Sequence, residues 1–189
     1  MIRIAILASG SGTNAENIVH YFKNNNSITV VQILSNKKDA YVLERAKHLN
    51  VDSLTFSRTD FYNSEELLTN LKLNADYIIL AGFLWKIPTS IIEAFPNKII
   101  NIHPALLPKY GGKGMYGMHV HRAVVENNEK ESGITIHYVN ENYDEGAIVF
   151  QKSFEVLDSD TPEDVAKKIH VLEQDNFPKV IEKVILENG

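Results

Sequence analysis

The sequence of 189 residues contains no cysteine. A chain without cysteine has no disulfide framework, no thiolate nucleophile and no cysteine-ligated metal. This absence fits a reducing compartment, and we predict a cytoplasmic protein. The sequence also has no apolar run of 18 or more residues, so we expect neither a membrane-spanning helix nor a membrane partner.

An excess of basic residues is lacking as well. Lysine and arginine total 19 residues against 24 aspartates and glutamates, for a net charge of −5. Non-specific binding of nucleic acid requires a basic face, so we expect no nucleic-acid partner. Because low-complexity tracts, internal repeats and linkers are also absent, we predict a single domain over residues 1–189.

What the sequence does contain is a regular alternation of predicted strands and helices. Strands are predicted at 2–8, 29–35, 51–56, 77–81 and 98–102. Helices are predicted up to Phe22 with Thr13 or Asn14 as cap, over 39–49, and up to Leu73 with Asn63 or Ser64 as cap. This alternation predicts βαβ units, and therefore an α/β, Rossmann-like fold with a mostly parallel twisted sheet flanked by helices.

The last third of the chain has a different pattern. Residues 133–139 and 147–154 read as two strands joined by a short loop, which predicts a hairpin. We expect a helix to start near Thr161 and to end near Glu173, with a further helical piece after Pro178.

A glycine-rich turn follows the first predicted strand. Gly10–Ala15 fits the pattern G-x-G-x-x-G/A between a strand and a helix, where free N–H groups face an incoming anion. An NAD site usually has an acid after the second strand, but Leu34–Lys37 has none. NAD is therefore disfavoured, NADP stays open through Lys37, and a single phosphate ester is the simpler ligand.

Two polar side chains end the strand at 98–102. Asn101 and His103 are two residues apart, so they point to one face beyond the carboxyl end of the strand. An amide and an imidazole there can donate to a developing oxyanion, and the imidazole can also move a proton. We expect Asp144, from the loop at 142–146, to contact His103, to raise its pKa and to favour the imidazolium.

The segment Asn101–Tyr110 resembles the N-x-H-P-S-L-L-P signature of the folate-dependent formyltransferases. Val139–Gly146 is similar to the folate-binding loop of that family, and three shorter segments agree with it. These segments are Ser9–Asn14, Ser35–Lys37 and Leu80–Phe83. The resemblance extends from about Ile2 to Pro178, which is nearly the whole chain.

The resemblance implies roles for individual residues. Asn101, His103 and Asp144 fall on catalytic positions, and Thr135 falls on a hydroxyl position near them. The implied substrate-binding residues are Gly12, Thr13, Asn14, Gly82 and Glu173. The implied folate-binding residues are Leu84, Trp85, Lys86, Ile87, Val139, Asn140, Glu141 and Asp144. Residues 1–100 would then form the half that binds the phosphorylated substrate, and 101–189 the catalytic and folate-binding half.

The implied reaction moves the formyl group of 10-formyltetrahydrofolate to the amine of 5-phosphoribosylglycinamide in purine synthesis. It requires no metal, and its partners are two small molecules and, at most, a second copy of the chain. Three alternatives stay open: another formyl transfer or formyl-folate hydrolysis on the same core, an NADP-dependent oxidoreductase, and a phosphate-binding module without chemistry.

The chain departs from the family pattern in three places. Ala105 replaces the usual serine, and Trp85 stands where a basic residue is frequent. Lys109–Gly117 carries additional glycines, and we predict a mobile lid or rim loop there.

Several histidines lie outside the motif. His119 and His121 are a poor metal pair if their segment is helical, and we expect no metal there. We expect a structural role for His137, while His170 shares a helix face with Glu173.

Overall fold

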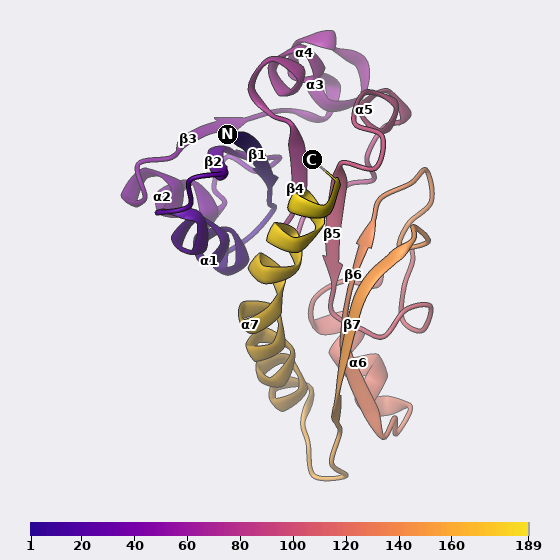
Figure 1. Cartoon of the computed structure of the whole chain (residues 1–189). Coiled ribbons are helices and arrows are strands. Elements are labelled where there is room, and N and C mark those ends of the chain that lie inside the picture. Colours follow the sequence, from indigo (N-terminus) through magenta and orange to yellow (C-terminus); the bar gives the residue numbers. More distant parts are fainter. Residues whose placement is uncertain (189) are drawn as a thin grey trace. The chain divides into compact units, whose positions relative to one another are not determined.

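The computed structural model describes residues 1–188, and of Asn188 only the backbone. The chain divides into two compact units, Met1–Ile100 and the part that starts at Asn101 (Figure 1). Strand β5 (Ile99–His103) crosses this division. The single-domain organisation stays a prediction, and each unit is described separately.

The first unit is built on parallel strands, as the alternating pattern predicted. Its strands are β1 (Ile2–Leu7), β2 (Ile28–Ser35), β3 (Asp52–Thr55) and β4 (Tyr77–Leu80), in the order β3-β2-β1-β4. Its helices are α1 (Thr13–Phe22), α2 (Tyr41–His48), α3 (Arg58–Asn63), α4 (Glu65–Asn74) and α5 (Thr89–Ala94). Residues 4–7 of β1 have no exposed surface, which explains why this strand is continuously apolar rather than alternating.

Several helix starts differ from the prediction. The cap of α1 is Gly12, and neither Thr13 nor Asn14 serves as its N-cap. Ser64 caps α4, as predicted, but the separate helix α3 precedes it. A capping box between Ser57 and Asp60 starts α3, a helix that was not predicted.

The second unit contains the predicted hairpin. Strands β6 (Glu131–Tyr138) and β7 (Ile148–Glu155) pair antiparallel, and β5, β6 and β7 follow one another in the strand order. Its helices are α6 (Met118–Glu126), which was not predicted, and α7 (Pro162–Asn188). The α/β fold with a mostly parallel sheet is therefore confirmed.

Helix α7 continues through Pro178, so the predicted break after Glu173 is wrong. A proline inside a helix costs about 3 kcal/mol, because it cannot donate the helical hydrogen bond. Phe177, Ile181 and Ile185 are fully buried on the same helix, and each such side chain contributes roughly 1.5–3 kcal/mol. Burial of this apolar face outweighs the cost of Pro178. None of the described helices is long and apolar enough to cross a membrane.

Candidate functional site

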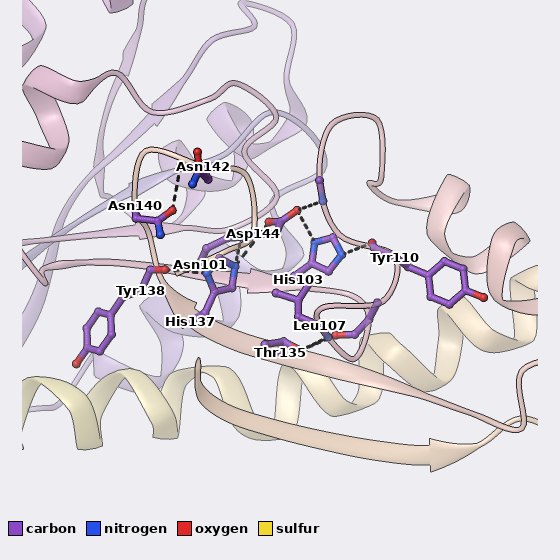
Figure 2. A network of polar contacts seen from close by, with 12 residues as sticks. Asn101, His103, Leu107, Tyr110, Thr135, His137, Tyr138, Asn140, Asn142 and Asp144 are labelled. Atoms are coloured by element: carbon purple, nitrogen blue, oxygen red, sulfur yellow. Dashed lines mark hydrogen bonds and ion pairs between the residues drawn. The ribbon is translucent and has the colours of Figure 1, made fainter. Parts of the chain in front are cut away.

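Polar side chains at the end of β5 meet the β6–β7 hairpin inside the second unit (Figure 2). Asn101 and His103 lie two residues apart in β5, and His103 is buried, with 4% of its surface exposed. Asp144 comes from the connection between β6 and β7, where its backbone is left-handed, with a φ of 56°. The three predicted catalytic residues are therefore brought into one network.

The Asp144 carboxylate lies between two histidines. Its Oδ2 atom is 3.5 Å from His103 Nδ1, and its Oδ1 atom is 3.7 Å from His137 Nε2. The backbone N–H of Gly112 donates to Oδ2 over 2.9 Å. Burial raises the pKa of Asp144, but the contact with His137, the positive charge that His103 carries when it is protonated, and the Gly112 N–H outweigh burial, so this pKa lies below its usual value. Asp144 is therefore a carboxylate at neutral pH.

The hydrogen bonds of His103 indicate its tautomer. Its Nε2 atom is 2.7 Å from the carbonyl oxygen of Tyr110, which can only accept, so we assign the proton to Nε2. Burial, together with the nearby His137, lowers the pKa of His103 by more than Asp144 and the Tyr110 carbonyl raise it. Asp144 does raise the pKa of His103, as predicted, but the predicted net rise and the favoured imidazolium were wrong, because the prediction left out the loss of water on burial. In this site His103 is a neutral imidazole whose free Nδ1 atom faces Asp144.

His137, for which a structural role was expected, belongs to the same network as the predicted catalytic residues. Its Nδ1 atom is 2.8 Å from the Tyr138 carbonyl oxygen, so we assign its proton to Nδ1. The free Nε2 atom then accepts from Asn101 Nδ2 over 3.0 Å. This bond orients the Asn101 amide. A signal did exist: a histidine on a predicted strand with apolar neighbours is often buried and then requires polar partners.

Thr135 holds the chain that follows His103. Its hydroxyl donates to the Ala105 carbonyl over 2.6 Å and accepts from the Leu107 N–H over 3.0 Å. Gln151 Nε2 also donates to it over 2.9 Å. The Ala105 contact uses only its backbone, and its side chain is fully buried. Alanine in place of the usual serine therefore leaves this anchor unchanged.

The glycine-rich segment Lys109–Gly117 is fastened next to the network. Lys109 Nζ and Tyr110 Oη both bond to Glu129, each over 3.0 Å. The same segment supplies the Tyr110 carbonyl to His103 and the Gly112 N–H to Asp144. The backbone of this loop is thus the direct partner of two predicted catalytic side chains. Its motion as a lid stays a prediction.

In the first unit, the turn at Gly10–Ala15 leads directly into α1. Gly12 has a φ of +78°, and a Cβ atom there would lie 2.3 Å from Val42 Cγ2. Only glycine fits this position. Thr13 and Asn14 form the first positions of α1, a ten-residue helix, and Arg45 Nε donates to the Ser11 carbonyl over 2.8 Å. The predicted phosphate loop therefore has the form of a braced helix start.

The predicted folate segment Leu84–Ile87 also lies in the first unit. The ring of Trp85 packs with those of Phe56, Phe61, Tyr62 and Phe83. The Arg58 guanidinium lies 5.8 Å from the centre of the indole ring, so a positive charge accompanies the tryptophan that replaces a basic residue. A cavity of about 300 Å³, lined by Arg58, Thr59, Tyr62 and Asn63, adjoins this cluster.

Other predicted residues lie outside the network. Lys86 accepts from Tyr62 Oη through its carbonyl over 2.9 Å, Ile87 is buried, and Gly82 has a φ of +74°. Val139, Asn140 and Glu141 follow β6, where Asn140 Oδ1 accepts from the Asn142 N–H. Glu173 lies on α7, with Oε2 at 4.0 Å from His170 Nδ1. The structure thus gathers the catalytic residues but divides the folate set between the two units.

His119 and His121 both lie on α6. His121 is buried, and its Nδ1 atom has no hydrogen-bond partner among the described residues. No group of three histidine, aspartate or glutamate side chains within residues 1–188 is placed to hold a metal ion.

We predict that acid destabilises the protein through its buried histidines. Burial lowers the pKa of His103 and of His121, and for His121 the nearby His103 adds to this effect. The unfolded chain then binds these protons more readily, so stability is lost as the pH falls from about 6.5 toward the lower folded pKa values. Each group contributes a slope of up to about 1.4 kcal/mol per pH unit. Urea unfolding between pH 7.5 and 5 measures this slope. The His121→Gln variant should show a smaller one, and an unchanged slope would contradict the prediction.

Comparisons with known proteins agree with the motif. The family described as "Formyl transferase" matches residues 2–181. Phosphoribosylglycinamide formyltransferase of Bacillus subtilis is 35% identical over 98% of this chain and 95% of its own length. The chloroplastic enzyme of that name from Arabidopsis thaliana is 42% identical over 88% of this chain. The crystal structure of glycinamide ribonucleotide transformylase 1 from Symbiobacterium toebii has a TM-score of 0.86 and 36% identity, and the match covers 96% of this chain and 86% of that one.

Some relatives are much longer than this chain. The chain spans 60% of the Arabidopsis protein and 14% of the trifunctional purine biosynthetic protein of Chironomus tentans. Because the family matches almost the whole sequence, and the Bacillus relative aligns along nearly its full length, the chain belongs to the formyl transferase family.

Proposed function

We propose that the protein transfers the formyl group of 10-formyltetrahydrofolate to the amine of 5-phosphoribosylglycinamide, a step of purine synthesis. The observation that carries the proposal is the network of Asn101, His103, His137 and Asp144 in a chain of the formyl transferase family. Several relatives are named phosphoribosylglycinamide formyltransferases, which supports the same acceptor. The comparisons favour neither a hydrolase nor an NADP-dependent oxidoreductase.

The substrate amine attacks the formyl carbon, and a tetrahedral intermediate with an oxyanion forms. One amide N–H of Asn101 is engaged by His137, and the second is free to donate to that oxyanion. The unprotonated Nδ1 atom of the neutral His103 ring takes the proton that the amine loses. Asp144 lies 3.5 Å from Nδ1 and stabilises the imidazolium.

Collapse of the intermediate breaks the bond between the formyl carbon and N10 of the folate. The imidazolium of His103 returns the proton to N10, so the histidine ends neutral, as it began. The products are the formylated ribonucleotide and tetrahydrofolate. The chemistry uses positioning and electrostatic stabilisation and requires no metal.

Binding residues are assigned on the same basis. Gly12, Thr13 and Asn14 receive the phosphate at the start of α1, while Gly82 and Glu173 contact the rest of the ribonucleotide. The folate is bound by Leu84, Trp85, Lys86, Ile87, Val139, Asn140, Glu141 and Asp144. The cytoplasmic location and the choice between monomer and homodimer stay predictions.

The proposal is tested by an absorbance assay with 10-formyltetrahydrofolate and 5-phosphoribosylglycinamide, in which each is omitted in turn. Loss of the formyl group that depends on the ribonucleotide amine is the expected result. Loss of the formyl group without the ribonucleotide would indicate a hydrolase. No reaction in any mixture would overturn the proposal.

A further inference from the structure

Ser9 is a buried serine at the carboxyl end of β1, with 2% of its surface exposed. Its hydroxyl donates to Asn36 Oδ1 over 2.7 Å and accepts from the backbone N–H of Leu84 over 3.0 Å. Its own N–H donates to the Gly82 carbonyl over 3.1 Å. One residue thus joins the segments that follow β1, β2 and β4.

The bonds to Gly82 and Leu84 close a turn around Ser9. Gly82 has a left-handed φ of +74°, so the chain changes direction there and enters the segment Leu84–Ile87. The hydroxyl of Ser9 is the partner of the first N–H of that segment. A hydroxyl supplies one donor and one acceptor within a small volume, and alanine supplies neither.

The bonds of Ser9 position two segments with predicted binding roles, the phosphate loop and the folate segment. Gly10, the first residue of the predicted phosphate loop, follows Ser9 directly, and Trp85 follows Leu84. Asn36 lies in a turn in which the Lys37 N–H donates to Ser35 Oγ over 3.2 Å. Without the Ser9 hydroxyl, Leu84 loses its partner, and the segment it leads is free to shift relative to β1.

We propose that Ser9 is a positioning residue for the folate cosubstrate, acting through the backbone of Leu84. The inference rests on the proposed function, because it takes Leu84–Ile87 as part of the folate site. Ser9 does not touch the reacting atoms, and Asn101, His103 and Asp144 lie in the other unit. Its loss therefore affects the binding of folate more than the chemical step.

The test replaces Ser9 by alanine and measures kcat and both KM values. We expect the KM for 10-formyltetrahydrofolate to rise about tenfold, the size of effect that one lost hydrogen bond produces. The kcat at saturation and the KM for the ribonucleotide should change by less than about threefold. A matched control is Ser132→Ala, because Ser132 is also 2% exposed and its hydroxyl has no partner among the described residues.

A binding measurement gives a second readout without turnover. Trp85 is the only tryptophan and lies within the segment Leu84–Ile87. Its fluorescence emission during a titration with folic acid therefore reports directly on that segment. The Kd of folic acid should rise about tenfold in Ser9→Ala, in step with KM. It should be unchanged in Ser132→Ala.

If Ser9→Ala does not fold, the same measurements are made on Asn36→Ala. This variant keeps the Ser9 hydroxyl as acceptor for Leu84 but lets it rotate, so a KM increase of about threefold is expected. An unchanged KM and Kd in a folded Ser9→Ala, or in Asn36→Ala where Ser9→Ala does not fold, would overturn the inference. If the wild type binds folic acid but transfers no formyl group, the proposed function fails, and the two Kd values still test Ser9.

Discussion

The His103→Ala variant is expected to lose about 10³–10⁴-fold in kcat, near the upper range for removal of a general acid–base group. The reason lies in the site: His103 Nδ1 is the unprotonated nitrogen beside the Asp144 carboxylate, and we propose that it carries the proton from the amine to N10. The KM values should change much less than kcat, because His103 is assigned to the chemical step. Steady-state kinetics on the purified variant measure this split.

Two further variants make the His103 result specific. The His103→Gln variant keeps an N–H that can reach the Tyr110 carbonyl but has no titratable nitrogen, and its loss should match that of alanine. The exposed His20, on α1 of the first unit, serves as the control, since His20→Ala should turn over like the wild type. Turnover within tenfold of the wild type in folded His103→Ala would remove His103 from the mechanism.

The second large effect is expected from Gly146→Ala. A Cβ atom at position 146 would lie 1.6 Å from the Tyr138 carbonyl oxygen, and 2.7 Å from its carbon, a distance that no packing allows. The Ala147 carbonyl accepts from the Tyr138 N–H over 2.9 Å at this point, so the end of the hairpin must shift. Asp144 lies two residues away, and a displacement of about 1 Å in a catalytic group costs on the order of 10²-fold in rate.

Kinetics and thermal unfolding together test the Gly146 prediction. We expect kcat to fall by about 10²-fold or more and Tm to drop, since the clash also strains the β6–β7 pairing. The Glu145→Ala variant is the matched control, because Glu145 is the exposed neighbour in the same loop. Normal kcat in Gly146→Ala would mean that the backbone here does not hold Asp144 in place.

The parts of the site that lie along one strand could be predicted from the sequence. Asn101 and His103 share a face because of strand geometry alone. The resemblance of Val139–Gly146 to the folate-binding loop then identified Asp144 as the third catalytic residue. His137 could not be assigned to the network in the same way, because its partner Asn101 is 36 residues away. The direction of the His103 pKa also depends on burial, which is a property of the packed chain and of no motif.

The fold shows the same contrast between features set by neighbouring residues and features set by distant contacts. The apolar strand β1 and the turn after it were evident, since each is specified by neighbouring residues. The continuity of α7 was not, because Pro178 locally signals a break, whereas Phe177 and Ile181 are buried by the tertiary fold. At Pro178 the local rule failed because distant contacts decided the outcome.

The partner of His103 Nε2 is a main-chain carbonyl, an atom that every amino acid possesses. Replacement of the Tyr110 side chain therefore leaves the accepting atom in the chain, and acts on this interaction only through the backbone, which the Tyr110–Glu129 bond and the φ of 56° at position 110 help to fix. What can change it is the path of the backbone, through the length or the glycine content of the loop. Insertions, deletions and replacements of the loop glycines, all of which alter the course of the backbone, are thus the changes that reach this histidine.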